Sequence, residues 1–383
     1  MRILHVITRL ILGGAQQNTV LSCRAQVEAG HDVHLAFGPI HGPEGSLLEE
    51  ARASGATLHE VTSLVRELSP RQDLAAYRAL RRLTRETQPD LVHSHSSKAG
   101  VVARAAAWAE RDRGLRVVHT VHGLPFHDRQ SRLRHRLYVG LERYAAKRCD
   151  HLIAITPAMV EAFVEHRIAA AAKFTVIPSG IDVEAFKPRP ERREAVRDRF
   201  GIPRNAKVVG HVGRLDPLKG HTDLLDVLPD LQDDHETWLL LVGDGFHRVA
   251  IEAHPSMKLG RTVLTGLVPL ADVPDYLAAM DVMALPSYQE GQSRTLCEAL
   301  LCGVPVVGYD VGGIPSVVID GETGRLAPVG DRAALSAALL DVLRDPGYGA
   351  RLVAAGREHV AEHFSADAMN RQLLALYERL VHP

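Results

Sequence analysis

The chain has 383 residues, of which 46% are hydrophobic and 24% charged, and its formal net charge is −1 at pH 7. At about 150 residues per domain, this length predicts two domains, and the composition is typical of a globular protein with a full core. The balanced charge excludes a general attraction to nucleic acid or to anionic membrane, so any such contact must be local. The four cysteines form no CxxC pair, and we interpret them as reduced thiols of a cytoplasmic protein. No apolar stretch reaches about 18 residues, so we expect no membrane-spanning segment.

Short apolar runs alternate with amphipathic segments along the first half of the chain, which predicts a parallel sheet covered by helices. The expected strands lie at 3–7, 33–37, 58–61, 91–95, 117–121, 152–155 and 175–177. The expected helices lie at 14–28, 47–54, 71–86, 99–109, 133–147 and 157–165. From 182 to 203 the chain is charged and rich in proline, and we interpret this segment as the passage between two domains.

The pattern begins again after this segment. The expected strands lie at 208–212, 238–242, 263–265, 282–285 and 304–309, and the expected helices at 221–232, 249–253, 273–280 and 296–302. We therefore predict an α/β protein with two doubly wound domains, 1–185 and 186–365. A C-terminal helix at 366–383 follows, and packing back on the first domain is one option for it. Ligands bind at the carboxyl ends of such strands, so we expect the active site in a cleft between the domains.

The stretch from Leu285 to Pro315 carries two glutamates, Glu290 and Glu298, on either side of an expected helix start. The first amides of a helix have no partner within the helix and favour anions and hydroxyl oxygens. Three interpretations are open: acceptors for the hydroxyls of a hexose and a ribose, the acid/base pair of a glycoside hydrolase, or solvated helix-end acids. Glu298 stands among apolar neighbours, where an acid needs a specific partner, and this weighs against the third. The hydrolase interpretation has no support elsewhere in the chain.

Two further loops contain groups that suit a phosphate. Gly13 and Gly14 follow the first expected strand and precede a helix, so their backbone can approach a phosphate closely. A tight turn without a ligand explains this pair equally well. Arg214 and Lys219 flank the loop GRLDPLKG after the first strand of the second half. An arginine fork and a lysine charge suit a diphosphate, and the alternative is two solvated loop charges.

Histidines gather in the first half of the chain, at His93, His95, His119 and His122. Their HxH and HxxH spacings suggest zinc, but no glutamate or cysteine stands at ligand spacing, so we expect no metal. His122 is followed by a glycine at the end of a strand and is the best placed to face the cleft.

The segment 129–148 holds seven basic residues and one acid, Glu142. Its apolar stripe is formed by Leu133, Leu137, Leu141 and Tyr144. A basic amphipathic helix can lie on anionic lipid. The alternative, an ordinary solvated helix that packs by this stripe, explains the pattern about as well.

Taken together, these motifs resemble those of the family-4 retaining glycosyltransferases, which have the GT-B fold of two Rossmann-like domains facing across a cleft. The matching pieces run in the family's order over nearly the whole chain. They are GGAQ at 13–16, HTVHG at 119–123, IPSGID at 177–182, VGRLDPLKG at 212–220, LLLVGDG at 239–245, EGQSRTLCEALLCGVPVV at 290–307 and VGGIP at 311–315. The pieces HSHSSKAG and TVHGLPF look like the branch of the family that builds capsule, exopolysaccharide or glycolipid chains.

The resemblance implies a role for each matching residue. Glu298 would hold the ribose hydroxyls of the donor nucleotide, and Glu290 would bind a hexose hydroxyl. Arg214 and Lys219 would clamp the diphosphate and stabilise charge on the leaving group. The expected catalytic residues are His122, which would contact the donor sugar close to the reacting carbon, Arg214, Lys219 and Glu290. The other expected donor contacts are Gly14, Ala15, Gly213, Val268, Gly291, Gln292, Ser293, Arg294, Thr295, Leu296 and Glu298.

The activity implied is a retaining transfer of a hexose-type sugar from a nucleoside-diphosphate sugar to a hydroxyl of a lipid-linked or growing glycan. UDP- and GDP-sugars are the donors expected first, and the base, uracil, guanine or adenine, is open. No metal or organic cofactor and no nucleic-acid partner are expected. A GT-B sugar-nucleotide epimerase and a non-catalytic sugar-nucleotide-binding protein are the rival interpretations. Gln292 and Ser293 stand where many relatives have Phe-Gly, so the donor sugar is open. We expect a cytoplasmic protein, located at the inner face of the plasma membrane if the segment 129–148 binds lipid.

Overall fold

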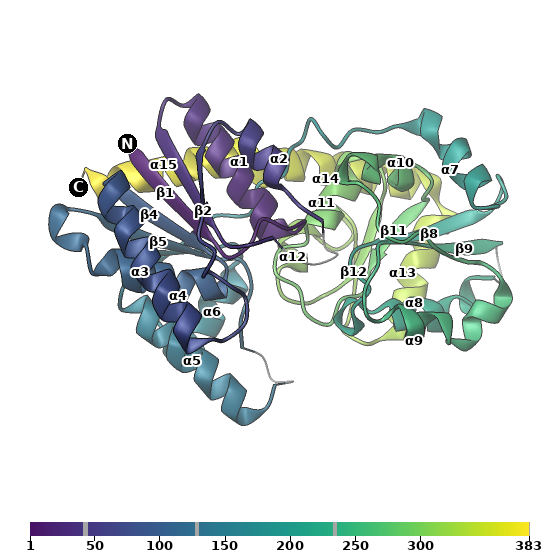
Figure 1. Cartoon of the computed structure of the whole chain (residues 1–383). Helices are drawn as coiled ribbons and strands as arrows, with labels where there is room; N and C mark the ends of the chain where they lie inside the picture. Colours follow the sequence, from purple (N-terminus) through teal and green to yellow (C-terminus); the bar gives the residue numbers. More distant parts are fainter. Residues whose placement is uncertain (41–44, 127–129, 233–235, 383) are drawn as a thin grey trace. The chain divides into compact units, whose positions relative to one another are not determined.

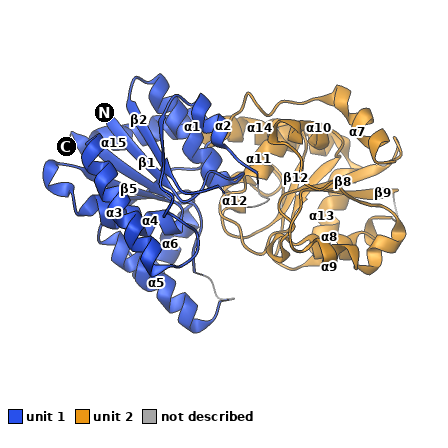
Figure 2. Ribbon diagram, in the orientation of Figure 1, with its two compact units in different colours: residues 1–180, 366–383 blue, residues 181–365 orange. Residues whose placement is uncertain are grey.

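A computed structural model describes residues 1–40, 45–126, 130–232 and 236–382. The chain forms two compact units (Figures 1 and 2). Unit 1 consists of Met1–Gly180 together with Ala366–Pro383, and unit 2 consists of Ile181–Ser365. The chain therefore passes from one unit to the other after Gly180 and returns after Ser365, where the sequence led us to expect boundaries after 185 and 365.

Unit 1 is a seven-stranded parallel sheet covered by helices, with strand order β3-β2-β1-β4-β5-β6-β7. The strands are β1 (Arg2–Ile7), β2 (Asp32–Phe37), β3 (Thr57–Glu60), β4 (Leu91–His95), β5 (Arg116–Val121), β6 (His151–Ala154) and β7 (Phe174–Val176). The helices are α1 (Gly14–Glu28), α2 (Leu48–Ala53), α3 (Pro70–Thr87), α4 (Ser97–Trp108), α5 (Arg132–Ala146), α6 (Pro157–Glu165) and α15 (Ala366–Val381).

Both faces of this sheet are covered, which explains why β4 is buried along its whole length and β1 and β5 are buried after their first residue. Successive side chains of a strand point to opposite faces. On β4, Val92 packs with Leu80 of α3 on one face, whereas its neighbour Leu91 packs with Leu373 of α15 on the other. The C-terminal helix is thus part of the core of unit 1.

Unit 2 repeats the design with six parallel strands in the order β10-β9-β8-β11-β12-β13. The strands are β8 (Lys207–Val212), β9 (Thr237–Val242), β10 (Thr262–Leu264), β11 (Val282–Leu285), β12 (Val306–Tyr309) and β13 (Arg325–Ala327). The helices are α7 (Arg193–Arg199), α8 (His221–Val227), α9 (Arg248–Glu252), α10 (Val273–Ala278), α11 (Arg294–Leu301), α12 (Ile314–Val317), α13 (Arg332–Arg344) and α14 (Pro346–His363).

In each sheet the first strand of the unit lies in the middle, and the strand order runs outward from it in both directions. The point of reversal falls between β1 and β4 in unit 1 and between β8 and β11 in unit 2. Ligands of doubly wound sheets bind beyond the carboxyl ends of the strands at such a point. The predicted α/β class with two Rossmann-like domains is confirmed.

The interpretation of 182–203 as an inter-domain passage was wrong. The segment lies within unit 2 and contains α7. Four of its arginines, Arg189, Arg192, Arg193 and Arg197, pair with aspartates of unit 2. Arg197 is 1% exposed and donates to Asp281 Oδ2 at 2.8 Å and to the Ala279 carbonyl at 3.0 and 2.9 Å. Arg189 and Arg192 both pair with Asp275. A high density of charge therefore indicated ion pairs and not a linker.

Within the described ranges, no helix has both the length and the apolar character needed to cross a membrane.

Candidate functional site

An ion pair lies at the point of strand reversal in unit 2. Lys219 follows β8, Glu290 follows β11, and Lys219 Nζ lies 2.5 Å from Glu290 Oε2. Ser287 Oγ donates to the same carboxylate oxygen at 3.2 Å. The two loops are joined by their backbones, because the Tyr288 amide donates to the Leu218 carbonyl at 2.8 Å. The side chains of Lys219 and Glu290 are 24% and 13% exposed, so the pair is sheltered yet open to a ligand.

Two glycines allow the backbone of these loops to pack closely. Gly312 has φ +57°, and a Cβ at this position would lie 2.1 Å from the Glu290 carbonyl oxygen. Gly220 has φ +70°, and its Cβ would lie 1.9 Å from the Pro286 carbonyl oxygen. Neither the conformation nor the space suits a side chain at either position. The position of Glu290 therefore depends on a glycine more than twenty positions further along the chain.

Arg214 and Gly213 begin the loop after β8. The Gly213 amide donates to the Val242 carbonyl at 2.9 Å, which fixes the start of the loop against the end of β9. Arg214 is exposed and, among the described residues, makes no hydrogen bond or ion pair. Its charge is therefore available to a ligand beside Lys219. Val268, after β10, is half-buried and packs against the core of unit 2.

Helix α11 begins at Arg294, after the loop that carries Glu290, and holds Glu298 among its buried residues. Ser293 caps the helix, and its Oγ accepts from the Leu296 amide at 3.4 Å. Glu298 is 4% exposed, and its Oε1 lies 3.9 Å from Arg294 Nε. Burial raises the pKa of Glu298, and the nearby Arg294 opposes this shift. A buried carboxylate with one distant cation gains from hydroxyl donors, which is what a ribose offers.

The remaining expected contacts around α11 differ in exposure. Gln292 and Ser293 are buried, whereas Gly291, Arg294 and Thr295 are half-buried. Burial also lowers the pKa of Arg294, with Glu298 opposing it. Arg294 thus acts as the counter-charge of Glu298.

In unit 1 the expected residues lie at the corresponding edge of the sheet. Gly14 and Ala15 are the first two residues of α1, and Gly14 is exposed. His122 follows β5, and its Nε2 lies 3.0 Å from Nδ1 of His95 at the end of β4. The expected residues therefore form two groups, one at the carboxyl-end edge of each sheet.

His5, His93 and His95 bring ring nitrogens within 4.8 Å of one another, a spacing that could hold a metal ion. However, both ring nitrogens of each histidine already have a hydrogen-bonding partner. The partners are His95 and Gln26 for His5, Tyr377 and Thr120 for His93, and His5 and His122 for His95. The cluster is a hydrogen-bonded network and not an open set of ligands.

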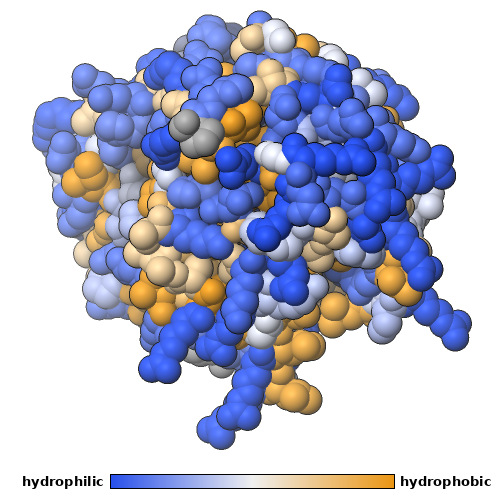
Figure 3. All heavy atoms as spheres, turned by 90° about the vertical axis from the view of Figure 1, so that its left-hand side faces the viewer, coloured by the Kyte–Doolittle hydropathy of each residue, from blue (hydrophilic) through white to orange (hydrophobic). Residues whose placement is uncertain are grey.

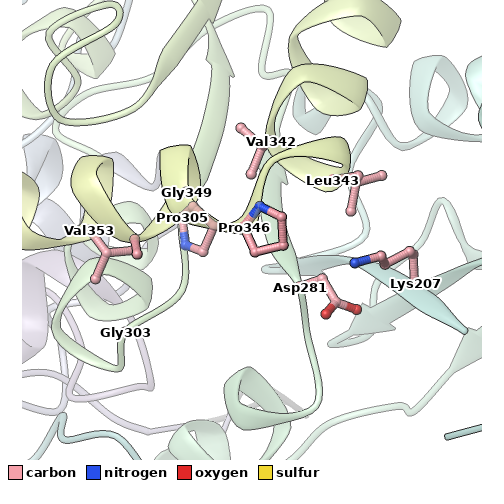
Figure 4. A pocket seen from close by; sticks show the side chains of 10 residues that line it. Lys207, Asp281, Gly303, Pro305, Val342, Leu343, Pro346, Gly349 and Val353 are labelled. Carbon is pink, nitrogen blue, oxygen red and sulfur yellow. The ribbon is translucent and has the colours of Figure 1, made fainter. Parts of the chain in front are cut away.

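A hollow of about 300 Å³ lies at the opposite edge of the unit 2 sheet (Figure 4). Lys207, Asp281 and Pro305 line it, and they stand at the amino-terminal ends of β8, β11 and β12. Pro346 closes it from the start of α14. The hollow therefore contains none of the expected donor contacts.

Sequence reasoning missed Ser287 and Gly312, which hold Glu290 through its side chain and its backbone. Gly312 lies in the motif VGGIP, so the motif itself was the signal, but its contact with Glu290 depends on the fold. Ser287 carried no signal beyond its position after a buried strand.

Comparisons with known proteins agree with the architecture. The family described as "Glycosyltransferase Family 4" matches residues 12–185, and the family described as "Glycosyl transferases group 1" matches residues 206–345. The 2-deoxystreptamine glucosyltransferase of Streptomyces kanamyceticus is 30% identical over 78% of this chain and 80% of that protein. The UDP-Gal:alpha-D-GlcNAc-diphosphoundecaprenol alpha-1,3-galactosyltransferase of Escherichia coli is 28% identical over 90% of this chain and 88% of that protein.

Among solved structures, Anabaena Alr3699/HepE in complex with UDP-glucose has a TM-score of 0.82 and 25% identity, covering 99% of this chain and 100% of that chain. Fold, site and relatives together define a glycosyltransferase with the GT-B fold. Within that class, the chain belongs to glycosyltransferase family 4, as its motifs predicted.

Proposed function

We propose that this glycosyltransferase moves a hexose-type sugar from a nucleoside-diphosphate sugar to a hydroxyl acceptor, with retention of the anomeric configuration. The observation that carries the proposal is the contact between Lys219 and Glu290 at the carboxyl ends of β8 and β11. A cation and an anion side by side suit a ligand in which a diphosphate adjoins a sugar that bears hydroxyls. Arg214 adds a second cation to the same loop, and Glu298 supplies a buried acceptor for the ribose.

A bound donor would separate the ion pair. Its diphosphate would attract Lys219 and Arg214, while a sugar hydroxyl would donate to Glu290, which Ser287 keeps in position. The cations would then stabilise the negative charge that develops on the leaving phosphate. The bond from the anomeric carbon to the phosphate oxygen breaks, the bond to the acceptor oxygen forms, and the acceptor proton passes to the phosphate. The proposal assigns no protein nucleophile and no metal.

The relatives support the classes of donor and acceptor. The Escherichia coli relative is named for UDP-galactose and a diphosphoundecaprenol-linked acceptor, and the Anabaena structure contains UDP-glucose. We propose a UDP-sugar as the first donor to test and a lipid-linked or growing glycan of the cell surface as the acceptor. Gln292 and Ser293, buried beside Glu290 and Glu298, are the residues that we expect to select the sugar.

Thermal stability offers the first test of the donor. A ligand at about 100 times its dissociation constant stabilises a protein by roughly 2.7 kcal/mol, which is measurable for each nucleoside diphosphate and its sugars. NMR of the product then reports the anomeric configuration, and an inverted product would contradict retention. NMR of the donor alone distinguishes the epimerase, which would convert the donor without an acceptor.

We further propose that α5 contacts anionic lipid at the inner face of the plasma membrane. The apolar stripe that the alternative interpretation placed in the core is largely exposed. Leu133 is 81% exposed, Leu137 47% and Tyr144 45%. The residues of α5 that are buried are Val139, Glu142, Ala145 and Ala146. The packing face therefore differs from most of the stripe, of which Leu141 alone is half-buried, and this weighs against the alternative interpretation.

Glu142, the acidic residue of α5, is buried and lies away from the surface. Glu142 Oε2 accepts from Arg104 Nη2 at 2.8 Å, and the two side chains are 4% and 0% exposed. The exposed side of α5 is thus basic and apolar, the combination that binds anionic bilayers. Arg129, the first residue of the expected basic segment, lies outside the described residues. Toward the lower edge of Figure 3, at the height of α5 in Figure 1, hydrophobic side chains lie between protruding hydrophilic ones.

Liposome flotation tests this contact. Vesicles with phosphatidylglycerol should carry the protein upward, vesicles of phosphatidylcholine alone should not, and Leu133→Ser with Leu137→Ser should weaken the binding. Leu68→Ser is the matched control, because Leu68 is 58% exposed elsewhere on unit 1. Equal flotation on both lipids would remove the membrane proposal without affecting the sugar transfer.

A further inference from the structure

A chain of hydrogen-bonded side chains runs through the core of unit 1 to His122. Gln26 Oε1 lies 2.8 Å from His5 Nε2, His5 Nδ1 lies 2.9 Å from His95 Nε2, and His95 Nδ1 lies 3.0 Å from His122 Nε2. Gln26, His5 and His95 are fully buried. This series of hydrogen bonds starts at Gln26 on α1, passes through His5 on β1 and His95 on β4, and ends just after β5.

The buried imidazoles of this chain are neutral. Burial lowers the pKa of His5 to about 4 and that of His95 well below its ordinary value, where the neighbouring histidines add to the effect. A neutral imidazole has one N–H donor and one lone pair, so each ring must donate through one nitrogen and accept through the other. The direction of hydrogen bonding at one end therefore decides the direction along the whole chain.

Gln26 sets this direction because a carbonyl oxygen can only accept. His5 must donate to it from Nε2 and accept at Nδ1 from His95 Nε2. His95 then accepts at Nδ1 from His122 Nε2. We propose that Gln26 is a positioning residue that fixes the tautomer of His122 through His5 and His95, so that His122 carries its proton on Nε2 and Nδ1 is its acceptor.

This inference deepens the proposed function, and one step of it rests on that function. If His122 contacts the donor sugar, an acceptor at Nδ1 favours a sugar that offers a hydroxyl hydrogen there and disfavours one in which that hydroxyl is missing. The tautomer itself follows from the hydrogen-bonded chain alone. The two claims can therefore fail separately.

Nitrogen-15 NMR of the histidine rings tests the tautomer directly, because protonated and unprotonated ring nitrogens have distinct shifts. The signals of His122 are identified by their loss in His122→Gln. In the wild-type protein we expect protonated Nε2 and unprotonated Nδ1. A protonated Nδ1 in the neutral ring would overturn the inference.

Gln26→Met removes the acceptor at the start of the chain. Keeping the original direction would leave a buried N–H on His5 unpaired, so the preference for that direction is lost; the reversed direction removes this N–H from His5 and places the ring proton of His122 on Nδ1. We therefore expect the Nδ1–H tautomer of His122 to rise. Ser22→Ala is the matched control, since Ser22 is buried on α1 and, within the described ranges, its hydroxyl bonds only the Asn18 carbonyl. Should Gln26→Met not fold, His5→Leu breaks the chain at the next link with the same expected result.

Activity separates the two claims. Gln26→Met should lower kcat/KM for the sugar nucleotide about 3- to 10-fold, the range for one neutral hydrogen bond, and leave the affinity for the nucleoside diphosphate unchanged. If the tautomer shifts and kcat/KM does not, the role of Gln26 stands and the contact between His122 and the sugar is overturned. If the tautomer of His122 is the same in Gln26→Met and in the wild type, the inference fails whatever the activity.

Discussion

Lys219 Nζ and Glu290 Oε2 lie 2.5 Å apart, although 71 positions separate the two residues in the chain. They meet because β8 and β11 are neighbours in the sheet of unit 2, and their loops leave it at the same edge. Each side chain is the counter-charge of the other. The pair therefore links the loops that follow β8 and β11.

Glu290→Ala and Lys219→Ala should each lower kcat by about 100-fold or more, because each removes a charge that the transition state needs. Both side chains are partly exposed, so the variants should stay folded. The rate of nucleoside diphosphate release measures the loss of turnover, and the Tm shows whether each variant stays folded. Lys207→Ala, at the opposite edge of β8, is the control and should keep full activity. Near-normal turnover in either site variant would count heavily against the assignment.

Gly312→Ala should lower both stability and kcat/KM. The alanine Cβ would lie 2.1 Å from the Glu290 carbonyl oxygen, so the loop that carries Glu290 must move. Gly201→Ala is a matched control, since Gly201 has a similar φ of +67° with no atom within 4 Å of its Cβ. Both variants bear the strain of a positive φ, which destabilises by about 1 kcal/mol or more. Equal activity in Gly312→Ala and Gly201→Ala would show that the contact between Gly312 and the Glu290 carbonyl does not position Glu290.

Glu298→Gln should stabilise the protein at neutral pH and weaken donor binding. Burial raises the pKa of Glu298 above its ordinary 4.5, so the folded state holds a proton that the unfolded state loses. This contribution to stability is complete below the unfolded-state pKa and is lost as pH rises through the folded-state pKa. The Tm difference between variant and wild type should therefore grow from about pH 4.5 upward. A Glu298→Gln variant less stable than wild type at about pH 8 would refute the argument.

The free energy of unfolding should fall steeply in mild acid. Burial lowers the pKa of the buried histidines His5, His93, His95, His119, His211 and His221. Their contribution is complete above the unfolded-state pKa of 6.5 and is lost as pH falls toward the folded-state value, which for His5 is about 4. Each such group changes the free energy of unfolding by up to about 1.4 kcal/mol per pH unit. Unfolding by guanidinium in weak buffer at about pH 5.5 should consume several protons, and an uptake near zero would contradict this.

The strands of both sheets could be predicted from the sequence, because buried parallel strands are short runs of β-branched and apolar residues. The expected strands appear with ends shifted by at most two residues, as for β12, which begins at Val306 and not at 304. β13 was missed because its three residues, Arg325–Ala327, give no periodic signal. Helices α13 and α14 were not predicted either.

Contacts between distant segments were less accessible to sequence reasoning. The stripe of α5 has the spacing of a packing face, but periodicity alone does not say which face meets the protein and which meets solvent. The buried pair of Arg104 and Glu142 decides this in the structure. In the same way, the ion pair between Arg197 and Asp281 could not be predicted from the sequence, because it requires that α7 packs beside the start of β11.

The residue types of the candidate site were expected from its motifs, and the roles assigned to them stay predictions. The apolar surroundings of Glu298 predicted a buried acid with a specific partner, and the structure shows it at 4% exposure beside Arg294. The contact between Lys219 and Glu290 was not predicted, because it depends on the strand order. The chain from Gln26 to His122 was hidden for the same reason.

The close approach of Gly220 and Gly312 to the loops of the site has a consequence for altering this enzyme. Attempts to change the donor sugar would start at Gln292 and Ser293, the residues that we expect to select the sugar. Libraries that also vary Gly220 or Gly312 would lose most members to misplaced loops, whatever sugar was selected. Gly220 and Gly312 should therefore be kept unchanged when residues nearby are varied to alter the specificity for the donor sugar.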